Sequence, residues 1–149
     1  MSDVSTSSPG CIRIAAVISH PIQHYAPVYR ILARTPGIEL RVFFCGENGV
    51  SRYRDEGFDA DIAWNVPLTD GYAHDFLEPG RVLEGFGFNQ VDSPRLNEAL
   101  SRFTPDVVWI HGYGQRLAWR AWFWARGRAR TVYTSVSYTH LTLPTILLV

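Results

Sequence analysis

"CIRIAAVISHPIQHYAPVYRILARTPGIELRVFFC" (residues 11–45) contains the pattern that predicts the fold. Its first part is rich in β-branched side chains and ends at a His-Pro turn, as is typical of a buried parallel strand. Residues 26–34 predict a helix, because Pro27 suits its first turn and an apolar stripe runs along it. That stripe comprises Val28, Ile31 and Leu32. Residues 38–45 predict a second strand, so the stretch forms a βαβ unit, which is right-handed almost without exception.

The alternation of strands and helices continues through the rest of the chain. Ser93 and Pro94 provide the cap and the first-turn proline of a second helix. The apolar stripe of this helix comprises Leu96, Ala99, Leu100 and Phe103. Further strands are predicted over 106–113 and 130–134, with a helix over 116–128 between them. Two weaker strand candidates cover 62–68 and 72–77. We therefore expect an α/β fold with a Rossmann-like, doubly wound parallel sheet.

Composition limits the classes of protein to which the chain can belong. Its 149 residues, 46% of them hydrophobic and 19% charged, are enough for one globular domain with a core. Fourteen basic and fourteen acidic side chains cancel, which argues against a nucleic-acid partner. Residues 1–10 predict a disordered leader without the features of a signal peptide. We expect a cytoplasmic protein that could touch a membrane from that side.

The two cysteines are predicted at opposite ends of neighbouring strands. Cys11 begins the first strand and Cys45 ends the second, so parallel pairing would hold the thiols too far apart for a disulfide. We expect both thiols to be reduced and buried.

The predicted strand order places two loops opposite each other. In an open parallel sheet, ligands bind beyond the carboxyl ends of the strands, where the strand order reverses. With the common order 3-2-1-4-5, the first strand lies beside strand 106–113, and the loops after them face one crevice. The candidate site residues of these loops are Ser19, His20, Pro21, Gln23, His24, Tyr25, His111, Gly112, Tyr113 and Gly114. The three histidines among them are the main chemical signal.

Each histidine also has an ordinary structural interpretation. His20 precedes a proline and could simply bond a backbone carbonyl, whereas His24 could cap the following helix. His111 ends a strand at the crevice and is the best candidate for function, while His74 is interpreted as a strand-face residue. No metal site is expected, because neither a nearby carboxylate nor a His-x-His spacing accompanies the three loop histidines.

Two glycine-bearing stretches and one helix allow further interpretations. "HGYGQR" (111–116) places two glycines before a helix, which predicts free backbone N–H groups and an anion site. "GFGFN" (85–89) follows no clear strand and is not assigned a role. The helix over 116–128 combines arginines with aromatic residues, so it could face a membrane. The favoured interpretation is a helix packed on the sheet with solvated arginines. The polar stretch 46–61 predicts a functional or mobile loop.

Five segments together resemble the N-terminal domain of the family 4 (group 1) retaining glycosyltransferases of the GT-B fold. They are "IRIAAVISHPIQHYAPVYRILA" (12–33), "GIELRVFF" (37–44), "GF" (57–58), "WNVPLTDGY" (64–72) and "PDVVWIHGY" (105–113). The first loop matches the narrower pattern S-H-P-x-Q-x-x-x-P, and the similarity extends over about residues 11–134.

The resemblance implies a two-domain enzyme that moves a sugar from a nucleotide sugar to a glycan, lipid-linked or small-molecule acceptor. The N-terminal domain would bind the acceptor, and a second Rossmann-like domain, absent from this chain, would bind the donor through a Glu-x7-Glu arrangement. By the same resemblance, Ser19, His20, Pro21 and Gln23 would lie near the sugar phosphate or the acceptor. His111 would lie near the reacting groups, with His20 as a second catalytic candidate. Such enzymes usually need no metal or other cofactor, and this half alone is not expected to turn over.

Two other functions and one question of origin stay open. The chain could be a non-catalytic nucleotide- or partner-binding domain, or a fragment of a two-lobed sugar-nucleotide epimerase. "VSYTHLTLPT" (136–145) back-translates to the end of a transposon-based sequencing adapter read in frame. We therefore interpret 135–149 as a non-native tail, with a natural strand and loop as the alternative.

Overall fold

The computed structural model describes residues 10–48, 68–112, 114–135 and 145–148. The predictions for the leader, the strand candidate 62–68, Tyr113 and most of the loop 46–61 fall outside the described residues. Most of the tail 136–149 falls outside them as well, so its interpretation as non-native stays a prediction.

Strands and helices alternate along the described chain. The elements are β1 (Ile12–Ile18), α1 (Ala26–Arg34), β2 (Ile38–Phe44), β3 (Ala73–Phe76), α2 (Arg95–Phe103), β4 (Val107–His111), α3 (Arg116–Ala125), β5 (Arg130–Ser135) and β6 (Thr145–Leu148). The sheet order is β3-β2-β1-β4-β5-β6. The first five strands of this order are parallel, and β6 adds to β5 in antiparallel direction. The Rossmann-like fold and the expected order around β1 are confirmed.

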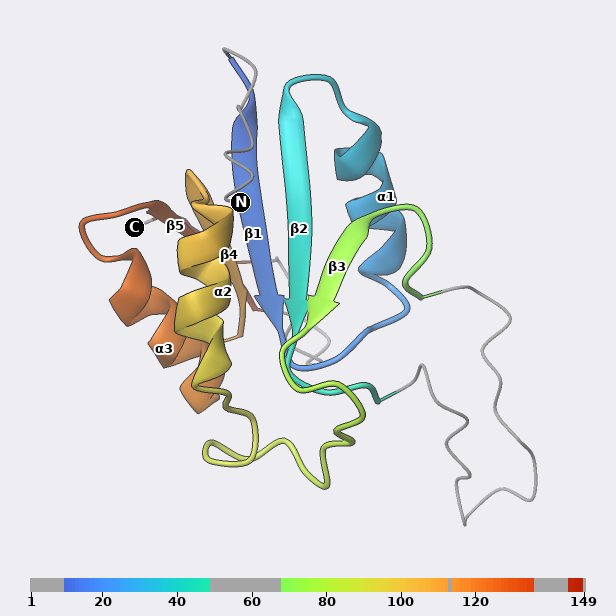
Figure 1. The fold of residues 1–149 in the computed structure, drawn as a ribbon, viewed down its shortest axis with the longest axis vertical. Coiled ribbons are helices and arrows are strands. Elements are labelled where there is room, and N and C mark those ends of the chain that lie inside the picture. Colours follow the sequence, from blue (N-terminus) through green and yellow to red (C-terminus); the bar gives the residue numbers. More distant parts are fainter. Residues whose placement is uncertain (1–9, 49–67, 113, 136–144, 149) are drawn as a thin grey trace.

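Helices cover both faces of the sheet (Figure 1), because the strands are apolar on both sides. In β1, Ala15 and Val17 belong to the core beneath α2 and α3, whereas Ala16 and Ile18 belong to the core beneath α1. Each core is closed by aromatic or leucine side chains from its own helices. Because helices cover both faces, a ligand can reach the sheet at the carboxyl ends of the strands, where ligands bind in such folds.

The buried face of α1 differs from the predicted stripe. Ala26 and Tyr29 are its buried residues, whereas Val28 is 40% and Ile31 67% exposed. Leu32, the third residue of the predicted stripe, does pack against the core. The Tyr29 ring lies 5.7 Å from the Trp109 ring, so burial of this large aromatic side chain turns Val28 and Ile31 toward solvent. In α2 the predicted stripe is confirmed, with Leu96, Leu100 and Phe103 buried and Ala99 packed beside them.

The two cysteines are unpaired, as expected from their positions. Strand pairing aligns Ile12 with Ile38 and Ile18 with Phe44, which places Cys11 and Cys45 at opposite ends of the pair. Cys45 is fully buried. The expectation that Cys11 is also buried is wrong, because this residue precedes the amino end of β1 and is only half-buried.

Candidate ligand-binding crevice

A pocket of about 270 Å³ lies where the loops after β1 and β4 meet. Its walls include several of the predicted site residues, namely Ser19, His24, Tyr25, His111, Gly112 and Gly114. The loop after β1 stays close to β2 at first, because the Gly46 N–H donates to the Ser19 carbonyl at 2.9 Å. It then closes on itself, with the Ala26 N–H bonding the Ile22 carbonyl at 3.3 Å as α1 begins. The two loops therefore meet, as predicted, at the point where the strand order reverses, which we call the switch point.

Three predicted residues do not line this pocket. The His20 ring lies behind Ser19, with its Nδ1 2.8 Å from Ser19 Oγ, and packs 4.8 Å from the Phe86 ring. Burial lowers the pKa of His20, which favours the neutral imidazole. Pro21 is buried and Gln23 is exposed, both away from the pocket lining.

His111 is enclosed by aromatic rings and hydroxyl groups. It is 8% exposed, and the rings of Tyr25 and Trp109 lie 4.3 and 4.4 Å from its own. Its Nε2 is 2.8 Å from the Tyr29 hydroxyl, and its Nδ1 is 3.1 Å from Thr134 Oγ1. Both ring nitrogens therefore have protein partners, from α1 on one side and from β5 on the other.

The hydrogen bonds around His111 favour one tautomer. Thr134 Oγ1 already accepts the indole N–H of Trp109 at 2.9 Å and lies at the pocket, where water can receive its proton. Tyr29 is 1% exposed, so its hydroxyl is best satisfied by donating to His111 Nε2. His111 would then donate from Nδ1 to Thr134, which assigns the imidazole proton to the nitrogen nearer β5.

The electrostatic environment keeps His111 neutral. Burial, reinforced by the nearby His24, lowers the pKa of His111 to about 3. Burial also raises the pKa of Tyr29 well above its ordinary value. A neutral histidine between two hydroxyl groups can orient its neighbours, but it carries no charge near pH 7.

The prediction of free N–H groups at the start of α3, which would form an anion site, is wrong for the first two residues of the helix. The Arg116 N–H donates to the Phe88 carbonyl and the Leu117 N–H to the Val91 carbonyl, each at 2.9 Å. A distant loop thus satisfies the donors that a free helix end would offer to a ligand. Gly112 takes a left-handed conformation, φ +79°, and its N–H bonds the Thr134 carbonyl at 2.8 Å.

The loop between β3 and α2 contributes to the crevice, which the sequence pattern did not indicate. Phe86, within the unassigned "GFGFN" stretch, lines the pocket beside Tyr25. The available signal in the sequence was a pair of aromatic residues, Phe86 and Phe88, that each follow a glycine. Their positions depend on contacts with other elements, which no local pattern encodes.

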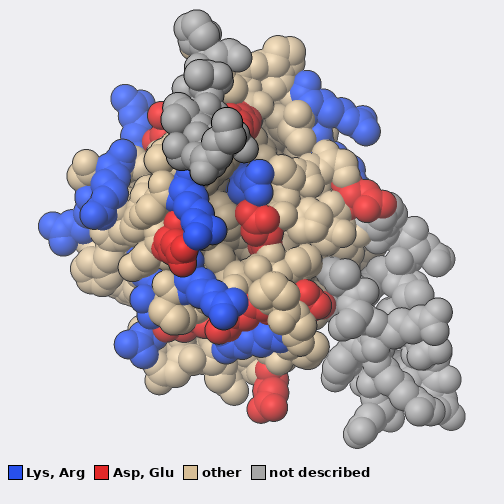
Figure 2. All heavy atoms as spheres, in the orientation of Figure 1, with Lys and Arg blue, Asp and Glu red and all other residues tan. Residues whose placement is uncertain are grey.

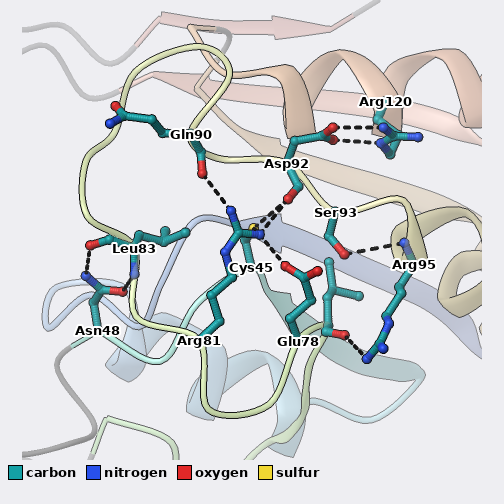
Figure 3. A network of polar contacts seen from close by, with 11 residues as sticks. Cys45, Asn48, Glu78, Arg81, Leu83, Gln90, Asp92, Ser93, Arg95 and Arg120 are labelled. Atoms are coloured by element: carbon teal, nitrogen blue, oxygen red, sulfur yellow. Dashed lines mark hydrogen bonds and ion pairs between the residues drawn. The ribbon is translucent and has the colours of Figure 1, made fainter.

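Arg81 is the centre of the network that shapes this loop (Figure 3). Its guanidinium donates to the carbonyls of Asp92 at 2.8 Å and Gln90 at 3.0 Å, and it pairs with Glu78. The Asp92 carboxylate in turn accepts two hydrogen bonds from Arg120, which lower its pKa. The loop is thereby tied to α3.

A second contact ties the beginning of the same loop to the end of β2. The side-chain amide of Asn48 donates to the Leu83 carbonyl at 2.9 Å and accepts the Leu83 N–H at 2.7 Å (Figure 3). The segment that carries Phe86 is therefore held on one side to the chain that follows β2 and on the other side to α3.

A second hollow, of about 770 Å³, lies over β2 and β3 beside α2 and is larger than the crevice. Its wall is rich in charged side chains, as is usual where a sheet faces water. Charged side chains in its wall pair with each other, as Arg41 does with Asp75 at 2.8 Å and Arg13 with Glu39 at 3.3 Å. It also lies away from the switch point. Within the described residues, no cluster of three or more His, Cys, Asp or Glu side chains could hold a metal ion.

No protein-family model, curated protein or solved structure is significantly similar to this chain. A candidate function therefore rests on the crevice and on the sequence resemblance.

Proposed function

We propose that this chain is the acceptor-binding half of a retaining glycosyltransferase that uses a nucleotide sugar, and that it is inactive without a donor-binding half. The observation that carries the proposal is the pocket at the switch point, one wall of which is the loop with the S-H-P-x-Q-x-x-x-P pattern. In this fold, ligands bind at that edge of the sheet.

The pocket combines two kinds of surface that suit a sugar. The rings of Tyr25 and Phe86 offer apolar faces for the C–H side of a pyranose, while Ser19 and His24 offer hydrogen-bonding groups for its hydroxyls. When the nucleoside diphosphate leaves, negative charge develops on its phosphate, and the imidazoles of His20 and His24 are the nearby groups that could donate to it.

His111 fits this proposal through its effect on Tyr25. Direct contact with the reacting groups would require a ligand to replace the Tyr29 or Thr134 hydroxyl at one ring nitrogen. With both bonds in place, the His111 ring supports the edge of Tyr25 at 4.3 Å and fixes the wall of the pocket.

None of the helices in the described residues has the length and hydrophobicity of a membrane span.

The first test is the gene beyond the codon for Thr134. We expect an uninterrupted reading frame that encodes a second Rossmann-like domain with paired glutamates. A natural stop codon shortly after this position would contradict the proposal.

The second test uses the complete protein, with transfer from a panel of nucleotide sugars as the readout. Tyr25→Ala should lower kcat/KM at least about tenfold, because one lost stacking contact of about 1.4 kcal/mol is a tenfold effect. Val28→Ala, at an exposed position three residues away, is the control and should leave kcat/KM unchanged. Ligand binding without transfer would replace the proposal with a non-catalytic binding domain. Conversion of the nucleotide sugar to its epimer without an acceptor would favour the epimerase.

A further inference from the structure

The residues of α3 that are not buried are all arginine or aromatic, and two of these aromatic residues, Trp122 and Trp124, pack partly against the core. The buried residues of the helix are Leu117, Ala118, Ala121 and Ala125, which pack on the sheet. The remaining residues of the helix are Arg116, Trp119, Arg120, Trp122, Phe123 and Trp124. Trp119 is 46% and Phe123 57% exposed, one helical turn apart on the same side. The expectation of a helix packed on the sheet is confirmed, and Arg116, Arg126 and Arg128 are exposed as that interpretation requires. The two exposed aromatic rings beside these arginines are the feature that it leaves unexplained.

The neighbouring helix shows what an ordinary outward face of this protein looks like. α2 covers the same side of the sheet, and its exposed side chains are polar and of both charge signs. They are Arg95, Asn97, Glu98, Ser101 and Arg102. The aromatic content of α3 is therefore a local property of that helix.

Positive charge is concentrated in the same part of the chain. Although the chain is neutral overall, Asp106 is its last acidic residue, and five arginines follow it. Figure 2 shows arginine side chains at the left edge of the molecule, over the end of α3 and the turn that follows. Among the described residues, Asp92 contacts α3 through its carboxylate, which is bonded bidentately by Arg120 and lies 3.7 Å from Arg116 Nε.

Two arginines that do not contact Asp92, Arg126 and Arg128, lie over tryptophan rings of α3. The Arg126 guanidinium is 5.3 Å from the centre of the Trp122 ring, and that of Arg128 is 5.5 Å from the centre of the Trp124 ring. Arg126 and Arg128 are exposed and can reach phosphates, while Trp119 and Phe123 are the exposed rings of the same helix that can bury in an apolar layer.

This surface is hollowed and reaches the loop that lines the crevice. A groove of about 1030 Å³ runs along α3, and Trp119, Phe123 and Phe88 are among its walls. Phe88 is held to the helix start by its carbonyl, which accepts the Arg116 N–H at 2.9 Å. Phe86, two residues away, lines the crevice, so the same loop contributes a side chain to each of the two hollows.

We propose that this face, defined by Phe88, Arg116, Trp119, Phe123, Arg126 and Arg128, docks the protein onto an anionic lipid surface. Such a surface supplies phosphates for the arginines and an acyl boundary for the rings, which is the chemistry that an interfacial helix of this composition binds. A second copy of the chain fits less well, because a symmetric contact would oppose the same arginines on both sides. The proposal goes beyond the proposed function and does not depend on it.

The test is co-sedimentation of the 149-residue chain with vesicles. We expect binding to vesicles of equal parts phosphatidylcholine and phosphatidylglycerol, weakened by added salt, and no binding to phosphatidylcholine alone. The double variant Arg126→Gln/Arg128→Gln should bind roughly 25-fold more weakly, at about fivefold for each arginine near the surface. Trp119→Ser/Phe123→Ser should also lose binding, and both pairs are at exposed positions where the fold tolerates substitution.

The control is Arg95→Gln/Arg102→Gln on α2, which makes the same change in net charge on the neighbouring helix. It should leave vesicle binding within about twofold, because these arginines lie outside the proposed face. Failure to bind the anionic vesicles, or equal losses in the α2 and α3 arginine pairs, would overturn the proposal. A dimer that Trp119→Ser/Phe123→Ser abolishes, without vesicle binding, would assign the face to a second copy.

Discussion

The imidazole of His111 lies between two hydroxyl groups and two aromatic rings, so its protonation depends on the fold and not on solvent. Tyr29 reaches it from α1, and Thr134 reaches it from β5. Protonation would place a charge in a nearly closed environment and would make both ring nitrogens donors. The hydrogen bond that we assign to the Tyr29 proton would then be lost.

The free energy of unfolding should therefore decrease as the pH is lowered, because His111 becomes protonated more readily in the unfolded chain than in the folded protein. In the unfolded chain a histidine takes up a proton near pH 6.5, whereas in the folded protein the pKa of His111 is about 3. Between these values the unfolded state binds more protons, so the free energy of unfolding decreases as the pH falls. From pH 7 to pH 5 the loss is on the order of 2 kcal/mol.

Urea unfolding at pH 7 and pH 5 measures this effect in the wild type and in His111→Asn. The variant has no titrating imidazole at this position, so it should lose about 2 kcal/mol less than the wild type between the two pH values. Equal losses in the two proteins would show that His111 is protonated in the folded state.

The turn between β4 and α3 delivers one edge of the crevice, and its two glycines are not equivalent. Gly112 has φ +79°, a conformation that side-chain-bearing residues rarely adopt, whereas Gly114 does not have a positive φ. Neither glycine has an atom within 4 Å of the position that a Cβ would take. Because a Cβ has room at both positions, a difference between the two substitutions would measure backbone strain at Gly112 alone.

Gly112→Ala should lower the free energy of unfolding by about 1 to 2 kcal/mol, because alanine is strained in the left-handed conformation. Gly114→Ala is the matched control, and we expect a change within about 0.5 kcal/mol there. Denaturant unfolding of both variants is the measurement. Similar losses at the two positions would mean that the turn does not need the left-handed residue.

Arg81 makes more of the hydrogen bonds that hold the loop with Phe86 than any other side chain shown in Figure 3. Arg81→Met removes the donors to the Gln90 and Asp92 carbonyls, so we expect a loss of about 2 kcal/mol and faster proteolytic cleavage between residues 78 and 92. Arg34→Met, at an exposed position in the last turn of α1, should change neither quantity appreciably. An unchanged cleavage rate in the Arg81 variant would mean that other contacts, and not Arg81, keep the loop ordered.

The molecule as a whole is one sheet with a core on each face, and the same strands contribute to both cores. Phe43 and Val42 of β2 point into opposite cores, as Val17 and Ile18 of β1 do. Loss of either core would expose the other side of the shared strands, so we expect the described domain to unfold as a unit.

Thiol reactivity reports this global opening. Cys45 lies in the core beneath α2 and α3, and burial raises the pKa of its thiol, which slows attack on a disulfide reagent. We expect one fast thiol, Cys11, and one slow thiol that reacts only when the sheet opens. Cys11→Ser should retain the slow phase alone. Two equally fast thiols in the folded wild type would contradict a closed core around Cys45.

Local pattern was sufficient for the elements, because hydrophobic period, prolines and caps act within a few residues. The alternation over 11–45 predicted β1, α1 and β2, and the stripe that begins at Leu96 predicted the buried face of α2. With the strand order taken from the common pattern for such folds, it also located the crevice between the loops after β1 and β4.

Contacts between distant segments decided the rest. The choice between two faces of α1 depended on the space that Trp109 and His111 leave for Tyr29. The donors at the start of α3 were taken by the loop at 88–91, which no pattern around Gly112 could indicate. The sequence by itself therefore determined which segments are strands and helices. Only the tertiary structure decided the partners of His111 and the composition of the outer face of α3, because hydrogen bonding and burial join residues that lie far apart along the chain.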